Sequence, residues 1–460
     1  MKIFPLFIFI FFFPVLLNAQ ESSLTVENAI KYALKNNPAI IAAAKNAEAS
    51  AHGESAAKAK YLPSVDVTAL GVKLDDAIYI DLNEIRSAVI GAGIISGGNP
   101  SVLEQSIPSF EKKISDDMYM RVKATVTQPV FTGFKISANS EIKKIERTVS
   151  EVKLKASKNF VVTSVIEDYY RVKLTDKLIE IRKDFLENIE NHVSNAQKLF
   201  NNGMISKANL LRTEVALAEA KKDYQKAMMD KELAAILLDN TLGIKIEGAL
   251  LSSPMEMIDG RKNSGFYVSK SENNNTSLLL LNSKKLMLKQ KHKTAVGNLL
   301  PSVAAMGEYQ ILRDKLMITE PEWTIAVQAS INIFGGGSDI NEIKASKTEI
   351  EAIEAQIEDA RNLIFTGVKK LYHQCETAKK DHEALEANKT LAEENLKLYR
   401  ASFREGLATS LEVVDAELAL TKIKIDQAKA VFDYNAAYAN LLNICAVSEE
   451  ELAPKYGEKK

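Results

Sequence analysis

Apolar residues recur every three or four positions along two long stretches of the chain that contain no proline. The first stretch lies between Gly133 and Phe200, and the second lies between Gly337 and Phe403. This spacing places the apolar side chains on one face of a helix. At a rise of ~1.5 Å per residue, each stretch predicts a helix of roughly 100 Å, several times the diameter of a compact domain. The apolar positions, typical of coiled-coil-like seams, are Leu174, Leu178, Ile181, Phe185, Ile189, Val193, Ala196 and Phe200 in the first stretch, and Ile343, Ile350, Ile353, Ile357, Ile364, Val368 and Leu371 in the second.

Strict alternation of apolar and polar residues marks the segments that precede these helices. Met120, Val122, Ala124 and Val126 alternate with polar residues in one segment, and the series from Trp323 through Ile325, Val327, Ala329 and Ile331 to Ile333 does so in the other. Such alternation predicts either a half-buried antiparallel strand of a soluble sheet or a strand of a membrane barrel with lipid outside and water inside. In the second case Trp323, Ile325, Val327 and Ile331 face lipid. Between the first pair of strands, from Leu74 to Met118, the sequence predicts a long loop.

The chain is an internal duplication. A shift of 203 residues places Phe200 on Phe403 and Gly203 on Gly406, and the match continues through the following segment. A shift of 238 residues superposes the Leu-Pro-Ser-Val motif that begins at Leu62 on the one that begins at Leu300. Each copy therefore reads helix, strand, loop, strand, long helix, hairpin, helix. The first of these helices begins at Thr25, a candidate N-cap, and is expected to bend at Pro38.

The N-terminus has the pattern of a secretory signal. Lys2 precedes an apolar run that ends at Leu17, and Leu17-Asn18-Ala19 offers small residues for cleavage after Ala19. Residues 1–19 are thus expected to be removed on export. No later stretch reaches the roughly 18 apolar residues of a spanning helix, so strands would have to place the chain in a membrane. Four strands cannot close a barrel, since the smallest need about eight, and closure would require other chains.

Composition and charge exclude several classes of function. The formal net charge of −1, from 59 Lys+Arg and 60 Asp+Glu, argues against nucleic acid as a partner. Two cysteines, Cys375 and Cys445, cannot build a disulfide framework or a thiolate zinc site, and we expect both thiols to be free. The sequence contains no combination of acid, base and nucleophile that suggests an enzyme. It predicts no cofactor site and no metal site. The five histidines lack metal-ligand spacing and are expected to be solvated helix residues: His52, His192, His292, His373 and His382.

Two glycine turns end the long helices. Gly203 and Gly406 occupy the position where a left-handed residue terminates a helix. Ser206 and Thr409 then offer N-caps, and Thr409 with Glu412 forms a capping-box pattern. Beside the glycines, Met204 and Leu407 are candidate exposed contacts for a partner. Glu412 and Asp415 share a helix face three residues apart, although Glu412 could act only as a cap.

Several of these motifs, taken in order, resemble the TolC-like outer membrane efflux proteins. The resemblance rests on residues 24–38, both Leu-Pro-Ser-Val motifs, the segments 128–131 and 333–336, and both glycine hairpins. It implies a mainly α fold with a small β part, in which three protomers each give four strands to a 12-stranded transmembrane β-barrel and their helices to a long coiled-coil-like helical barrel. It also implies that Gly203, Met204, Ser206, Gly406, Leu407 and Thr409 form periplasmic tips that contact an adaptor protein, and that Glu412 and Asp415 line a pore constriction. The first copy departs from this acidic pattern, with Asn209 and Arg212 at the matching positions, and Ala408 replaces a basic gate residue of some members.

The interpretation is a passive exit duct in the outer membrane that extends into the periplasm. It would serve efflux or type I secretion as a homotrimer, with a periplasmic adaptor, an inner membrane transporter and outer membrane lipid as partners. The alternative is a periplasmic adaptor-like helical hairpin protein without a pore. The expected organisation is a signal peptide at 1–19, a first repeat at 20–245, an equatorial linker at 246–275, a second repeat at 276–447 and a polar tail at 448–460.

Overall fold

The computed structural model describes residues 23–109, 111–245, 251–258, 260–313 and 321–446. The expected signal peptide and the polar tail at 448–460 lie outside the described residues. The chain divides into two compact units. One comprises Met1–Glu48, Val149–Asn282 and Ala355–Lys460, and the other comprises Ala49–Thr148 and Ser283–Glu354. The long helices run through both. Among the residues that the structure describes, no helix combines the length and apolar character needed to cross a lipid bilayer.

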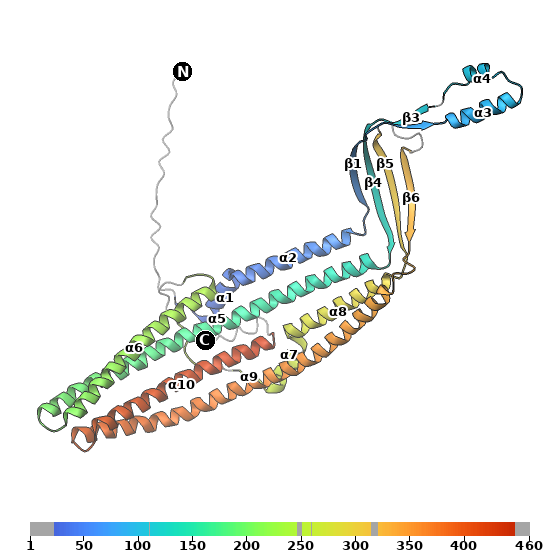
Figure 1. The fold of residues 1–460 in the computed structure, drawn as a ribbon. Helices are drawn as coiled ribbons and strands as arrows, with labels where there is room; N and C mark the ends of the chain where they lie inside the picture. The colour runs from blue at the N-terminus through green and yellow to red at the C-terminus, as the bar shows by residue number, and fades with distance from the viewer. Residues whose placement is uncertain (1–22, 110, 246–250, 259, 314–320, 447–460) are drawn as a thin grey trace, which may run out of the picture. The chain divides into compact units, whose positions relative to one another are not determined.

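The unit that contains Ala49–Thr148 is built on a four-stranded antiparallel sheet in the order β1-β4-β5-β6 (Figure 1). The strands are β1 (Ser64–Lys73), β4 (Met118–Thr132), β5 (Ser302–Arg313) and β6 (Trp323–Ser330). The expected strands are confirmed, but β6 ends at Ser330, so Ile331 follows the strand instead of lying in it. Beyond Ser330 the backbone turns toward the glycine run before the next helix, where Gly336 and Gly337 have φ of 63° and 82°. The glycine run thus forms a bend between the strand and the helix, because glycine adopts positive φ without steric cost.

The prediction of a long loop between Leu74 and Met118 is wrong, because this segment forms helices and strands. It contains β2 (Ile78–Asp81), α3 (Asn83–Ile95), α4 (Pro100–Ser106) and β3 (Glu111–Ser115), with β2 and β3 paired in a separate two-stranded sheet. Asn99 caps α4 by accepting a hydrogen bond from the Ser101 backbone N–H, and Pro100 occupies the first helical turn, where its missing N–H has no consequence. Gly97 and Gly98 follow the end of α3, whereas Gly91 and Gly93 lie within this helix.

The helix boundaries reproduce the duplication. The long helices α5 (Lys135–Asn201) and α9 (Ser338–Arg404) both have 67 residues, and both boundaries differ by the shift of 203. The return helices are α6 (Lys207–Leu242) and α10 (Ser410–Ile444), which form hairpins with α5 and α9 (Figure 1). At a shift of 238, α1 (Val26–Asn36) and α2 (Pro38–Ala59) match α7 (Ser264–Asn274) and α8 (Thr276–Gly297). Helix α7 therefore lies inside the segment 246–275 that the sequence assigns to a linker.

The break between α1 and α2 is fixed by an asparagine as well as by Pro38. The side-chain amide of Asn37 donates to the Thr241 carbonyl at 2.8 Å, and its oxygen accepts from the Ala39 N–H at 2.9 Å. Asn275 repeats this in the second copy, with its amide on the Ile444 carbonyl at 2.8 Å. The next residue is Thr276, at the position of Pro38 in the first copy. The break between α7 and α8 therefore forms without a proline. Each asparagine thus satisfies a carbonyl at the end of a return helix and an N–H at the start of the next helix.

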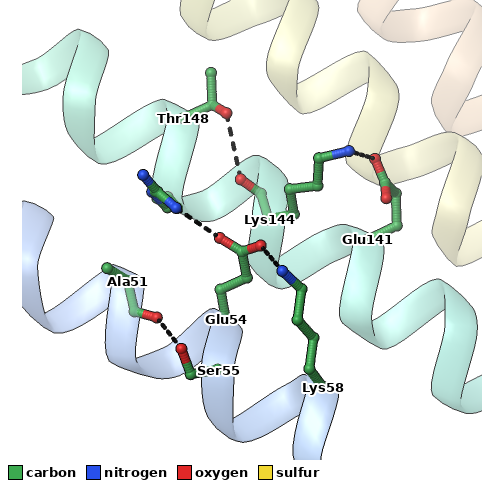
Figure 2. Close-up of polar contacts among 8 residues, drawn as sticks. Ala51, Glu54, Ser55, Lys58, Glu141, Lys144 and Thr148 are labelled. Atoms are coloured by element: carbon green, nitrogen blue, oxygen red, sulfur yellow. Dashed lines mark hydrogen bonds and ion pairs between the residues drawn. The ribbon is translucent and has the colours of Figure 1, made fainter.

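Helices α2 and α5 are tied together by a buried carboxylate. Glu54 is 5% exposed and accepts from Lys58 Nζ at 2.6 Å and from Arg147 at 3.3 Å. Figure 2 shows the Glu54 carboxylate with the Lys58 side chain directed toward it. A buried carboxylate needs such partners to remain charged. Further along the same unit, the turn between β4 and α5 meets the end of α8 at Gly133 and Gly297, where a Cβ on Gly297 would lie 1.9 Å from the Gly133 carbonyl oxygen.

Candidate functional site at the hairpin tips and the sheet face

Both hairpin tips have the same backbone design. Gly203 and Gly406 adopt left-handed φ of 73° and 74°, as the sequence predicts. The Met204 N–H donates to the Leu199 carbonyl at 2.9 Å, and the Leu407 N–H donates to the Ser402 carbonyl at 2.8 Å. These six-to-one hydrogen bonds are the signature of a Schellman motif, which satisfies a carbonyl at the end of each long helix.

The return helices begin at side-chain caps. Ser206 accepts from the Asn209 N–H, and Thr409 accepts from the Glu412 N–H at 3.3 Å. The Glu412 carboxylate accepts in turn from the Thr409 N–H at 2.7 Å, which completes the predicted capping box. The hydrogen bonds from the Thr409 backbone and hydroxyl lower the pKa of Glu412 below its usual value. Glu412 therefore has a structural role whether or not it also faces a pore.

The two apolar tip residues are exposed. Met204 is 58% exposed and Leu407 is 83% exposed. Beneath them the hairpins pack on one another through a shared cluster, in which Ala196, Leu210, Phe403 and Val413 are buried. The cluster therefore draws residues from all four helices of the two hairpins. The tips are thus a packed platform that carries two exposed apolar side chains at equivalent positions. Asp415, one turn into α10, is also exposed.

Two buried polar contacts hold this platform. The His192 ring on α5 lies 2.8 Å from the Ser410 hydroxyl on α10 and packs on Phe403, with ring centroids 4.7 Å apart. Two turns further along α10, Glu417 is 2% exposed and forms an ion pair with Arg400 of α9. The first contact links the two hairpins, and the second links the two helices of one hairpin.

Burial determines the charge state of His192. Desolvation lowers the pKa of this ring from its usual value; a smaller effect of hydrogen bonding at Ser410 opposes the shift, and a still smaller effect of the nearby Arg400 adds to it. The neutral ring can accept from or donate to the Ser410 hydroxyl. The expectation that every histidine is solvated is wrong for His192, which is 7% exposed.

The sequence contains a signal for both contacts that residue type alone obscures. His192 falls three residues after Ile189 and four before Ala196, on the buried seam of α5. Glu417 falls four residues after Val413 and three before Leu420, on the buried seam of α10. A polar residue at a seam position needs a partner on the facing helix. Following the three-and-four-residue spacing of each seam through its polar positions would have identified His192 and Glu417 as buried.

The strand register gathers apolar residues on one face of the sheet. Directly opposed residues of antiparallel strands share a face. Ile325 lies opposite Gly307, and Gly307 lies opposite Val126, which in turn lies opposite Val65. This face also carries Trp323, Val327, Tyr309, Ala124 and Val67. The other face is polar, and it includes an ion pair of 2.8 Å between Lys123 and Glu308.

The apolar face is uncovered in the chain. Trp323, Ile325 and Val327 are 64%, 76% and 71% exposed, and Val65 and Val67 are each 66% exposed. Ile331, just past β6, is 52% exposed. A continuous apolar surface of this kind indicates contact with lipid or with another chain.

Comparison with known proteins identifies the class. Residues 29–243 and 289–446 match the family described as outer membrane efflux protein. The chain belongs to this family. The structure is similar to the outer membrane protein VceC of Vibrio cholerae, with a TM-score of 0.74 at 14% identity over 92% of this chain and 96% of that one. It is also similar to the Campylobacter jejuni CmeC outer membrane channel, with a TM-score of 0.72 at 12% identity over 94% and 89% of the two chains. At these identities the likeness shows a shared fold.

A curated relative matches by sequence over a shorter region. It is the alkaline protease secretion protein AprF of Pseudomonas aeruginosa, 24% identical over 127 residues. That match spans 28% of this outer membrane efflux protein and 26% of AprF. Family membership confirms the expected fold class and outer membrane location, and it favours a channel over the adaptor-like alternative.

Proposed function

We propose that this outer membrane efflux protein is the passive exit duct of a multipartite export system. Three copies close their four-stranded sheets into one 12-stranded barrel, with the apolar face toward lipid and the polar face toward the lumen. The helices continue the conduit into the periplasm, where the tips receive an adaptor and an inner membrane transporter. The observation that carries this proposal is the uncovered apolar face of the sheet, which runs across all four strands in register.

Charge placed on either face of β6 tests the barrel. Val327→Arg puts a cation on the apolar face and should cost about 2–4 kcal/mol near the bilayer midplane. Gln328→Arg puts the same cation on the polar face and should be milder. The measurement is the yield of heat-modifiable trimer in the outer membrane fraction. Equal losses for the two variants would show that both faces meet water, and the barrel proposal would be wrong.

Adaptor docking at the tips is tested at Leu407. Leu407→Asp adds a charge at a side chain that is 83% exposed, so trimer assembly should be unchanged while export is abolished. Asn202→Asp is the matched control, because it adds the same charge beside the other tip without removing an apolar contact. Retained export by the Leu407 variant would remove this residue from the docking surface, and loss of the trimer would show that it packs in the assembly.

The constriction is tested by removing charge from α10. Three copies of Glu412 and Asp415 would give six carboxylates around a narrow axis, and such a ring attracts cations. Asp415→Asn should weaken the cation preference in single-channel recordings without changing assembly. Glu412→Gln should do the same and, because glutamine can also fill this position of the capping box, should keep the turn. Unchanged selectivity in the double variant would place both residues away from the pore.

A further inference from the structure

A small cleft lies where the sheet meets its helices. It has a volume of about 140 Å³ and is lined by Tyr61, Pro129, Val130, Phe131, Thr132, Phe134, Ile136 and Ser137. The lining is mostly apolar and aromatic, and none of these residues is acidic. Val130, Tyr61 and Phe134 are 65%, 48% and 44% exposed, so the cleft opens at the surface. It lies at the end of β4, where the apolar face of the sheet gives way to helices.

Specific contacts build the walls of this cleft. The Gln128 side-chain amide donates to the Tyr61 carbonyl at 2.9 Å, which fixes the α2–β1 junction against β4. Phe131 and Phe134 pack edge to face with ring centroids 5.4 Å apart. Phe134 has a φ of 65°, a conformation that side chains with a Cβ rarely adopt. The close approach of Gly133 to Gly297 brings α8 directly beside this turn and holds it there.

A cation is placed on the aromatic wall. Lys293 of α8 lies with its Nζ 4.9 Å from the Phe134 ring centroid. Lys293 is exposed, and Lys60 and Lys135, the chain neighbours of Tyr61 and Phe134, are also exposed. The cleft therefore combines an apolar interior with the Lys293 cation at its aromatic wall. An anionic headgroup with apolar chains has the complementary pattern.

We propose that this cleft binds an anionic phospholipid of the membrane's periplasmic leaflet, with Lys293 on the headgroup phosphate and an acyl chain against Val130 and Phe131. The site rests on the proposed function, because it requires the apolar face of the sheet to lie in a bilayer. All four strands meet their helices at this edge, as the pairing of Thr132 with Ser302 and of Ser302 with Ser330 requires. The cleft therefore lies at the depth of the headgroups if the sheet spans the hydrocarbon.

The test is native mass spectrometry of the detergent-purified trimer with added dioleoyl phosphatidylglycerol or dioleoyl phosphatidylcholine. We expect selective binding of phosphatidylglycerol. Lys293→Gln should weaken that binding about fivefold, as expected for one lysine near an anionic headgroup. Lys284→Gln, an exposed lysine of the same helix, is the matched control and should have no effect. Val130→Trp should fill the cleft and reduce the binding of both lipids.

Three results would overturn the site. The first is equal binding of the two lipids, the second is unchanged selectivity in Lys293→Gln, and the third is absence of binding by either lipid, as when a neighbouring copy covers the cleft. Glycerol phosphate, which has the headgroup charge without acyl chains, should not displace the lipid, and displacement would refute the role of the apolar wall. Any of these results, obtained with a trimer that still assembles and conducts ions, would refute the lipid site and leave the proposed function unaffected. Failure of the wild-type chain to form a membrane trimer removes the proposed function instead.

Discussion

Replacing Arg400 should loosen the second hairpin more than replacing its partner Glu417. The Glu417 side chain is 3% exposed and that of Arg400 is 37% exposed. Arg400→Met leaves a buried carboxylate without its cation, which should destabilise the hairpin by about 3–5 kcal/mol. Glu417→Met leaves a guanidinium that still reaches water, so the loss should be only about 1–2 kcal/mol. The double variant replaces both charges by apolar groups of similar size and should be within about 1 kcal/mol of wild type.

The assay is amide hydrogen exchange of the purified trimer, read on peptides that cover residues 396–420. Exchange under native conditions reports local opening free energies, so the three variants can be compared without unfolding the whole assembly. The asymmetry between the single variants and the recovery in the double variant are both required. Equal effects of the single variants, or a double variant whose loss equals their sum, would show that the ion pair does not stabilise the hairpin and would refute the reasoning.

The remaining predictions concern a glycine contact, a buried histidine and a buried thiol. Gly297→Ala should abolish assembled trimer, because its Cβ would lie 1.9 Å from the Gly133 carbonyl oxygen, whereas Gly53→Ala, with open space at its Cβ, should assemble normally. Burial lowers the pKa of His192, so the unfolded ring binds more protons than the folded one. Exchange protection at the tips should therefore be constant above about pH 6.5 and fall as the pH drops further. A His192→Gln variant should lose this pH dependence, and unchanged wild-type protection at about pH 5 would contradict the prediction. Burial raises the pKa of the Cys375 thiol to about 11, so maleimide should label it only after unfolding, and rapid labelling of the native trimer would contradict this.

The expectations that succeeded depend on local sequence. The turns at Gly203 and Gly406 and the cap at Thr409 are formed by residues within a few positions of one another, so their identity alone is sufficient to predict them. Cys375 and Cys445 are not joined by a disulfide in the structure, and both are buried. The failures depend on distant residues. His192 is buried because α10 brings Ser410 to it from 218 positions away, and residue type gives no account of that.

The sequence by itself determined the length of the two long helices, the bend at Pro38 and the duplication, because helical hydrogen bonds join residues four apart and an apolar seam shows as a regular period along the sequence. It also determined which side of β4 and of β6 is apolar, because side chains alternate along a strand. Only the tertiary structure decided that these sides coincide, because strand register depends on pairing between segments that lie far apart in the chain, such as Val126 and Gly307. The same holds for the partner of Glu417 and for the cleft beside Phe134, where residues from separate elements create a surface that none of them has alone.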